Sequence, residues 1–297
     1  MKIQTMFPLA FLISNRKMLI FKTVENLQNH ISQLRNKGKK IGFVPTMGAL
    51  HQGHLSLIQQ SKQTTDITVC SIFVNPTQFN DAKDLEKYPR TTEQDVDLLN
   101  SIKTDIIFLP SVEAVYPTNI DTSVNLDFGT LDKLMEGEHR PGHFAGVAQV
   151  VKRLLDIVQP DKLFMGQKDY QQFCICRNMI EQLQLPVEIV MCPIVRAESG
   201  LAMSSRNMRL SESEKVVAAN IHRVLLATKL NFDPTKITEL KTNSVFALNN
   251  IPEFRLDYFE IADGQTLLPA TERSESVVAC TAVFLGEIRL IDNMILL

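Results

Sequence analysis

The amino-acid sequence predicts an α/β protein whose parallel sheet is covered on both faces, followed by a smaller α+β part with an antiparallel sheet. Up to about residue 193, short apolar segments alternate with segments of helical periodicity. Beyond that point, three apolar runs follow one another with no helical segment between them. A chain of 297 residues with 44% hydrophobic residues can build two such cores.

The helices expected in the first part have apolar residues three and four positions apart. Val24, Leu27, Ile31 and Leu34 mark the first helix, and Gly38 ends it. Later helices are expected around Leu55 and Ile58 and at residues 91–102, 144–158 and 169–184. The β-branched and apolar runs between them predict strands at residues 41–44, 67–74, 105–109, 161–165 and 187–195.

The second part begins near residue 193. Ser211 and Glu214 have the spacing of a capping box and start a helix expected to reach about Leu230. The strands expected after it cover residues 254–262, 277–285 and 287–295, with Gly286 in a tight hairpin. We therefore expect domains at residues 18–192 and 193–297. Residues 1–17 are interpreted as a disordered extension or a start-codon artefact, because a clean pattern opens at Met18.

Composition argues against several classes of protein. A net charge of -2 gives no overall basic surface for nucleic acid. The apolar run at residues 7–13 is too short to span a bilayer, and no other segment suggests membrane insertion. Five cysteines form no even framework, and Cys174 and Cys176 lie on different helix faces. We expect a cytoplasmic protein with reduced thiols and no nucleic-acid or membrane partner.

The most informative segment is residues 42–54, where an apolar run leads through a glycine-containing turn to His51, Gly53 and His54 at a helix start. Backbone N–H groups at such a helix start have no partner within the helix and carry partial positive charge, so they suit a phosphate. Imidazoles add donors that can stabilise charge as a bond breaks. This segment predicts that the protein handles a nucleoside triphosphate.

Three further polar clusters lie at residues 75–79, 166–172 and 203–207. The first two directly follow predicted strands, where ligands bind in parallel α/β sheets. Each cluster alone has a simpler explanation: a turn, a solvated ion pair or a polar loop. The histidine pair could likewise cap a helix or ligate a metal. The common location of the clusters favours one site, and no Walker A, dinucleotide-binding or G-x-S-x-G motif is present.

The segment His51-Gln52-Gly53-His54 resembles the H-x-G-H signature of the nucleotidyltransferase and class I aminoacyl-tRNA synthetase superfamily. The chain is more closely similar to the pantoate–β-alanine ligase family. Six segments in the family's order and spacing carry that resemblance: residues 45–51, 73–79, 88–91, 140–147, 168–172 and 200–207. The resemblance runs from about Met18 to the C-terminus.

The resemblance implies a Rossmann-like domain with a smaller C-terminal lid. Its members first make pantoyl-adenylate and pyrophosphate from ATP and pantoate. The amine of β-alanine then attacks the acyl group and AMP leaves. The resemblance further implies Mg²⁺ with the ATP substrate, no prosthetic group, and a homodimer. The alternatives are another nucleotidyltransferase of this fold and a nucleotide sensor without activity.

The resemblance also implies roles for individual residues. His54 is expected as proton donor, with His51 and Lys168 as further catalytic residues. Gln78 and Gln172 are expected to bind pantoate, and Gln78 also β-alanine. The expected ATP contacts are Met47, Gly48, Ala49, Leu50, His51, Gln52, Gly53, His54, Gly166, Gln167, Lys168, Asp169, Val195, Met203, Ser204, Ser205 and Arg206.

Three points stay open from sequence. Asn75 and Arg140 are additional candidate contacts. The Mg²⁺ ligands are unknown, and Asp84, Glu86 and Asp95 are candidates only because they are acidic and near the site in sequence. Many family members have Glu where this chain has Gln167. The flanking Gly166, Lys168 and Asp169 are intact, so we expect the same reaction.

Overall fold

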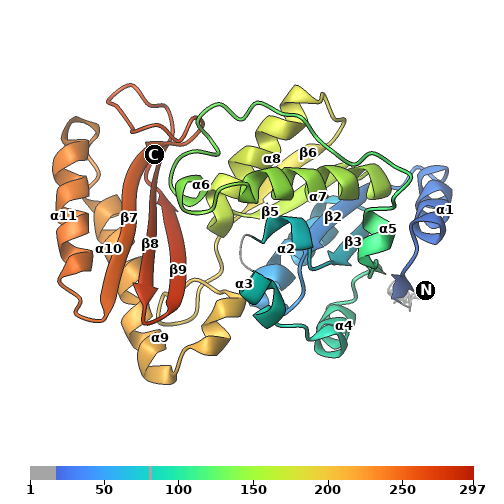
Figure 1. Cartoon of the computed structure of the whole chain (residues 1–297), viewed down its shortest axis with the longest axis horizontal. Coiled ribbons are helices and arrows are strands. Elements are labelled where there is room, and N and C mark those ends of the chain that lie inside the picture. The colour runs from blue at the N-terminus through green and yellow to red at the C-terminus, as the bar shows by residue number, and fades with distance from the viewer. Residues whose placement is uncertain (1–17, 80–81) are drawn as a thin grey trace, which may run out of the picture.

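The computed structural model describes residues 18–79 and 82–297, and the side chains of 82–84 are not part of the description. Two sheets organise the described chain (Figure 1). The larger is a six-stranded parallel sheet of β1 (Leu19–Phe21), β2 (Ile41–Thr46), β3 (Ile67–Ile72), β4 (Ile106–Phe108), β5 (Lys162–Gly166) and β6 (Glu188–Cys192). The smaller is an antiparallel sheet of β7 (Phe254–Asp263), β8 (Val277–Leu285) and β9 (Ile288–Ile295).

The strand order of the larger sheet places its ligand site. The order is β1-β4-β3-β2-β5-β6. The chain thus builds outward from β2 in one direction through β3 and β4, and then returns to add β5 and β6 on the other side. The change of direction lies between β2 and β5. In doubly wound sheets, the crevice at this switch point, at the carboxyl ends of the strands, binds ligands.

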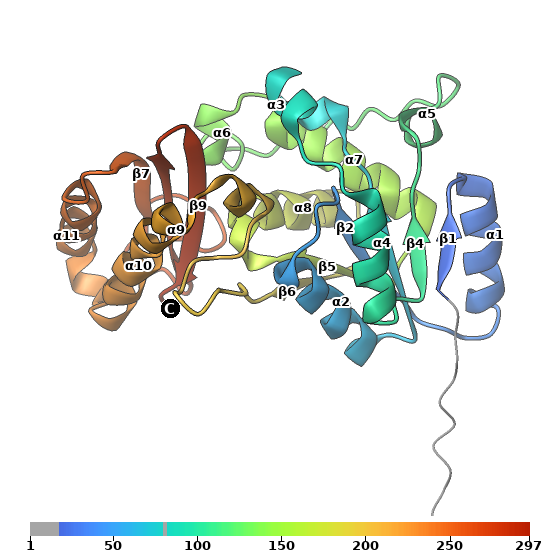
Figure 2. The same cartoon turned by 90° about the horizontal axis from the view of Figure 1, so that it is seen from below.

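Helices cover both faces of this sheet (Figures 1 and 2). One face packs against α1 (Val24–Arg35), α7 (His143–Val158) and α8 (Tyr170–Gln182). The other packs against α2 (Gln52–Thr64) and α4 (Thr92–Ser101). Adjacent strand residues point to opposite faces, so Phe43 belongs to the first core and Val44 to the second. Strands buried on both faces explain the continuous apolar runs in the sequence.

The C-terminal part has a core of its own. The β7–β9 sheet packs with α9 (Glu212–Ala218), α10 (Asn220–Leu230) and α11 (Ile237–Asn249). Figure 2 shows β9 on the side of this sheet that faces the larger sheet. Short helices α3 (Ala82–Lys87), α5 (Val112–Val115) and α6 (Glu136–His139) complete the first part. The predicted fold class, a doubly wound parallel sheet followed by an α+β part, is confirmed.

Several expected elements differ in detail. The helix expected up to Leu230 is divided at Ala219 into α9 and α10. The strand expected at residues 187–195 ends at Cys192, because Pro193 has no N–H to donate to the ladder. Helix α11 and strand β1 were not predicted. The interpretation of residues 1–17 falls outside the described residues. No helix among the described residues is long and apolar enough to cross a membrane.

Candidate active site

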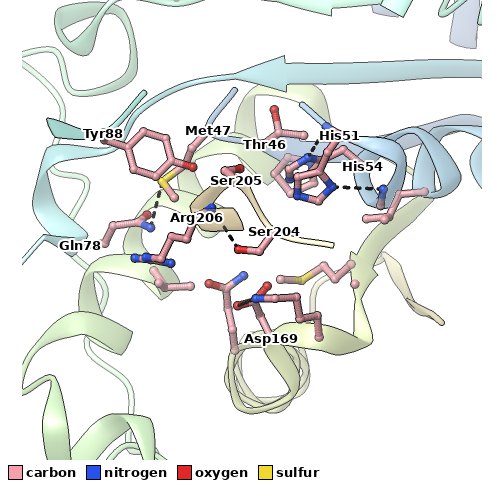
Figure 3. Close-up of a pocket in the computed structure, with 18 of the residues that line it drawn as sticks. Thr46, Met47, His51, His54, Gln78, Tyr88, Asp169, Ser204, Ser205 and Arg206 are labelled. Atoms are coloured by element: carbon pink, nitrogen blue, oxygen red, sulfur yellow. Dashed lines mark hydrogen bonds and ion pairs between the residues drawn. The ribbon is translucent and has the colours of Figure 1, made fainter. Parts of the chain in front are cut away.

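A cavity of about 340 Å³ lies at the carboxyl ends of β2, β3 and β5, a size typical of small-molecule sites. All four polar clusters contribute to its lining, although they are up to 160 residues apart in the sequence. His51 and His54 lie on one side of this cavity, and Gln78, Met47 and Tyr88 lie on the other (Figure 3). Arg206, Ser204, Ser205 and Asp169 lie between these two sides.

The two histidines are held by the start of α2. His51 is the N-cap residue, and its Nδ1 accepts the Gly53 N–H at 3.1 Å. The Nδ1 of His54 accepts the His51 N–H at 3.3 Å. A neutral imidazole has one donor and one acceptor nitrogen, so each ring carries its hydrogen on Nε2. Gly53 is required because a Cβ there would lie 2.9 Å from the His51 ring.

Both rings are neutral at physiological pH. Burial, together with His51 and Lys168, lowers the pKa of His54 to about 3 against the opposing charge of Asp169. Burial, with the charge of Lys168, lowers the pKa of His51 to about 4. The ring centroids are 4.1 Å apart, so a charge on one ring would oppose a charge on the other. The pair is therefore a source of neutral Nε2–H donors.

The segment between β2 and α2 is fixed by a buried carboxylate. Asp95 of α4 is 1% exposed and accepts the N–H groups of Ala49 at 2.9 Å and Leu50 at 2.8 Å. These two N–H groups are therefore occupied, and neither residue lines the cavity. This placement gives Ala49 and Leu50 a structural role, and their contact with ATP stays a prediction. Asp95 is likewise a backbone anchor in this structure and not a free candidate for Mg²⁺.

The segment at residues 203–206 packs directly against the loop between β2 and α2, residues 47–51, which we call the histidine loop. The Ser205 hydroxyl donates to the Ala49 carbonyl at 3.0 Å. Ser204 accepts the Arg206 N–H at 3.3 Å through its hydroxyl, which shapes the short turn. The Met203 N–H donates to the Val195 carbonyl at 3.0 Å, so both of these residues reach the cavity together. The two segments expected to hold ATP are thus joined in space.

Charged groups gather beside these segments. Lys168 and Asp169 follow β5, and the Lys168 Nζ is 3.9 Å from a carboxylate oxygen of Asp169. Enclosure by protein opposes ionisation of Asp169, but the positive charges of Lys168 and Arg206 outweigh it and hold its pKa below the usual value. Asp169 is the one acidic side chain lining this cavity among the described residues.

Gln78 sits in a buried hydrogen-bonded network and is 8% exposed. Its Oε1 accepts from Asn75 at 3.2 Å and its Nε2 lies 3.2 Å from the Met47 sulfur. The Oδ1 of Asn75 accepts in turn from the Tyr116 hydroxyl at 2.9 Å. A Cβ on Gly146 would lie 2.8 Å from the Gln78 Cα, so glycine lets α7 approach this segment.

Adjacent glutamines on α8 have different surroundings. Gln172 lines the cavity. Gln171 is buried and holds the 131–136 segment, donating to the carbonyls of Leu131 and Leu134 and accepting from the Glu136 N–H. Successive residues of a helix point in different directions, which separates the two environments.

The structure brings most expected site residues together. Those lining the cavity are Met47, His51, Gly53, His54, Gln78, Gly166, Lys168, Asp169, Gln172, Val195, Met203, Ser204, Ser205 and Arg206, with the additional candidates Asn75 and Arg140. Gly48, Ala49, Leu50, Gln52 and Gln167 do not line it. The sequence interpretation did not assign His143, which lines the cavity and whose Nδ1 lies 2.8 Å from the Gln78 carbonyl oxygen. Its position in the segment 140–147 was the available signal.

Neither cysteines nor acidic clusters form a metal centre in the part of the chain that is described. No group of three or more His, Cys, Asp or Glu side chains converges there. All five cysteines are free and buried. Of the acidic candidates for Mg²⁺, Glu86 is exposed and does not line the cavity. The side chain of Asp84 lies outside the description.

This doubly wound sheet has two segments at its switch point that suit phosphate groups, one with His51 and His54 and one at residues 203–206. This combination is typical of an enzyme that handles nucleotides. Comparison with known proteins agrees. The profile of the pantoate-beta-alanine ligase family matches residues 19–295. Pantothenate synthetase from Porphyromonas gingivalis is 49% identical over 282 residues, covering 93% of this chain and 99% of the relative. The enzyme from Bacteroides thetaiotaomicron is 48% identical over 279 residues, with coverage of 93% and 98%.

Solved structures give the same result. The crystal structure of pantothenate synthetase from Thermus thermophilus has a TM-score of 0.86 at 41% identity, covering 93% of this chain and 99% of that one. Pantoate-beta-alanine ligase from Francisella tularensis, complexed with beta-gamma ATP and beta-alanine, has a TM-score of 0.76 at 33% identity, covering 94% and 98%. The chain belongs to the pantoate–β-alanine ligase family. Its activity is the ATP-dependent condensation of pantoate with β-alanine through pantoyl-adenylate.

Proposed function

We propose that adenylation and amide formation both take place in the cavity at the carboxyl ends of β2, β3 and β5. The observation that carries this proposal is the arrangement of its polar groups. Neutral histidine donors lie on one side, Gln78 lies on the other, and Lys168 and Arg206 complete the lining. Cations and neutral donors suit a triphosphate, and a neutral amide suits a carboxylate that has to react.

In the first step, an oxygen of the pantoate carboxylate attacks the α-phosphorus of ATP. The bond from that phosphorus to the bridging oxygen breaks, and pyrophosphate leaves with the electron pair. Negative charge grows on the leaving group, where His51, His54 and Lys168 supply donors and positive charge. The hydroxyl of Ser204 and the guanidinium of Arg206 act on the same phosphates. The Ser205 hydroxyl donates to the Ala49 carbonyl and so holds this segment beside the ATP site.

We propose that His54 donates a hydrogen bond and does not transfer a proton. Its Nδ1 already accepts a backbone N–H, and its pKa of about 3 leaves no proton to release near neutral pH. Pyrophosphate does not need that proton to leave, because the positive charges of Lys168 and Arg206 stabilise its negative charge. This proposal differs from the role of proton donor that the family resemblance implies for His54.

Gln78 and Gln172 are assigned to pantoate. Neutral amides hold its hydroxyls and carboxylate without the strong attraction of a cation, so the carboxylate stays nucleophilic. Phe73 and Val147 line the same cavity and offer apolar surface to the two methyl groups of pantoate. Met47, Gly53, Gly166, Asp169, Val195 and Met203 remain proposed ATP contacts.

In the second step, the neutral amine of β-alanine attacks the acyl carbon of the adenylate. The bond from that carbon to the phosphate oxygen breaks, AMP leaves with the electron pair, and the proton lost by the nitrogen passes to AMP or to solvent. Gln78 is proposed to contact β-alanine as well as pantoate. The Francisella tularensis relative, complexed with beta-gamma ATP and beta-alanine, supports both compounds as substrates of this chain.

The remaining features of the function are also proposals. Asp169 is the lining carboxylate that would share Mg²⁺ with phosphate oxygens, which is the usual way this ion is held. We propose two domains at residues 18–192 and 193–297, the second acting as a lid, and a cytoplasmic homodimer. Size-exclusion chromatography with light scattering tests the dimer directly.

Crystals soaked with ATP and pantoate test the site. We expect pantoyl-adenylate in this cavity, with its phosphate near the Nε2 atoms of His51 and His54 and its pantoyl group near Gln78 and Gln172. An adenylate bound elsewhere, or in the reverse orientation, would contradict these assignments.

A further inference from the structure

Two adjacent residues of β9, Asp292 and Asn293, hold two of the segments to which ATP contacts are assigned, the turn at residues 166–169 and the segment 203–206. We propose that they are positioning residues for adenylation. Asn293 places Lys168, and Asp292 places the segment of Ser204 to Arg206. This inference rests on the proposed function of those two segments. It adds a role for the C-terminal sheet, from which no residue was expected at the site.

Asn293 is tied to the turn that carries Lys168. It is 2% exposed, and its Nδ2 donates to the carbonyl oxygens of Gln167 at 2.9 Å and Lys168 at 2.8 Å. Its Oδ1 accepts from the Gln167 Nε2 at 3.1 Å. One amide therefore fixes two consecutive carbonyls from 125 residues away in the chain. This contact also gives Gln167 a role, although Gln167 does not line the cavity.

Asp292 acts on the other segment through Arg196. It is 5% exposed, and its carboxylate accepts from the Arg196 guanidinium at 2.6 and 3.0 Å. Arg196 also donates to the Gly200 carbonyl at 3.1 Å and pairs with Ala202 across the short hairpin. Residues 203–206 follow this hairpin directly. The ion pair therefore fixes the position of the hairpin from which the segment of Ser204 and Arg206 continues.

Placement of the backbone matters here because it sets the point from which the Lys168 side chain reaches into the cavity. The ion pair recorded for its ammonium group is a 3.9 Å contact with Asp169, which restrains it weakly. The location of the ammonium group thus depends on the backbone that Asn293 holds. A displacement of about 1 Å in a group that stabilises a transition state can cost about 10²-fold in rate.

The test uses double-mutant cycles on the single-turnover rate of pantoyl-adenylate formation. Asn293→Asp keeps the shape of the side chain but replaces a donor by an oxygen facing two carbonyl oxygens. We expect a rate loss of about 10- to 100-fold with Lys168 present. In a Lys168→Ala background the same substitution should cost less than about threefold, because the group it positions is gone.

Asp292→Asn provides the reciprocal cycle. It should slow adenylation in the wild-type background, add little to Arg206→Ala, and add its full effect to Lys168→Ala. Asn293→Asp should instead add little to Lys168→Ala and add its full effect to Arg206→Ala. A general loss of folding would lower the single-turnover rate by the same factor in both backgrounds. It would therefore not produce this crossed pattern.

Asn243→Asp on α11 is the matched control, since Asn243 is exposed and far in the fold from the cavity. Val283→Ala, in the core of the same sheet, controls for lost stability. Both should keep the wild-type rate within about twofold. If Asn293→Asp does not fold, Asn293→Ala removes the donor to both carbonyls without adding a charge, with the same expected dependence on Lys168.

Two results would overturn the proposal: a folded Asn293→Asp variant with wild-type rate, or equal losses with and without Lys168. Both are distinct from failure of the proposed function, in which the wild-type protein itself would form no adenylate from ATP and pantoate.

Discussion

At the scale of single residues, the histidine pair illustrates how local hydrogen bonds decide chemistry. Backbone N–H groups occupy both Nδ1 atoms, so the Nε2–H groups are the ones left to act. The sequence predicted the pair and its helix start from spacing alone. It could not give the protonation state, because burial and the charge of Lys168 lower the two pKa values.

His54→Ala should lower the rate of adenylation by about 10²-fold, as losing one donor to a developing charge typically does. His54→Asn is the matched variant, since its amide can still donate a hydrogen bond without acid chemistry, and it should recover part of the loss. Single-turnover pyrophosphate release measures both. A wild-type rate in the alanine variant would remove His54 from the reaction.

The pH dependence separates a hydrogen-bond donor from an acid. Because the pKa of His54 is about 3, the ring is already neutral from pH 6 to 9. The adenylation rate of the wild-type protein should therefore not fall through this range on account of His54. A His54-dependent loss of rate as the pH rises through 6.5, absent in His54→Asn, would instead indicate a proton donor.

Gln171 and Gln172 form a natural pair of test sites. Gln172→Ala should raise the KM for pantoate much more than that for ATP, because Gln172 lines the cavity as a neutral amide. Gln171→Ala should instead lower the free energy of unfolding, by about 1–3 kcal/mol, because it leaves two carbonyls without a donor. Steady-state kinetics and urea unfolding distinguish the two. Equal effects of Gln172→Ala on both substrates would count against its assignment.

At the scale of elements, the starts of α2 and α7 hold three histidines with lowered pKa values: His51 and His54 are half-buried and His143 is buried. Burial lowers the pKa of His143 to about 4, with a contribution from Arg140. These rings stay neutral in the folded chain, whereas the unfolded chain binds protons below about pH 6.5. The unfolded state is therefore favoured as the pH falls, so the free energy of unfolding should decrease from pH 7 to pH 5.

Urea unfolding between pH 7 and pH 5 checks this dependence. We expect a decrease on the order of 1 kcal/mol or more, and a shallower slope when His54 and His143 are both replaced by asparagine. An unchanged slope in the double variant would show that these histidines do not set it.

The elements missed from sequence have physical reasons. Helix α11 buries Leu240, Ser244 and Leu248, but Thr and Asn residues around them weaken its intrinsic preference. It is supported by packing within the C-terminal core. Strand β1 has three residues, and its partner is β4, more than 80 residues away. Contacts at such separation leave no local periodicity to detect.

At the scale of the whole molecule, the order of strands and helices along the sequence was enough to predict the fold class. Alternating periodicity predicted the parallel sheet, and its loss near residue 193 predicted the antiparallel one. The carboxyl ends of β2, β3 and β5 then brought the polar clusters together, as parallel topology requires. Sequence could not place Asp95 under the histidine loop or Asn293 beside Lys168, since both contacts depend on how distant segments pack.

Contacts between the two sheets bear on the same site. Arg289 of β9 forms a bidentate pair with Glu136 of α6 at 2.7 and 2.8 Å, which adds to the contacts of Asp292 and Asn293. Strand β9 therefore connects the C-terminal sheet to α6, to the turn that carries Lys168 and, through Arg196, to the segment before Ser204. The geometry of the catalytic groups depends on both parts of the chain.

Isotope exchange between ATP and pyrophosphate, measured with pantoate and without β-alanine, tests the central claim most directly. An acyl-adenylate forms reversibly before the amine enters, so labelled pyrophosphate should pass into ATP when pantoate is present and not when it is omitted. Exchange that needs β-alanine, or that occurs without pantoate, would contradict an acyl-adenylate made in this cavity.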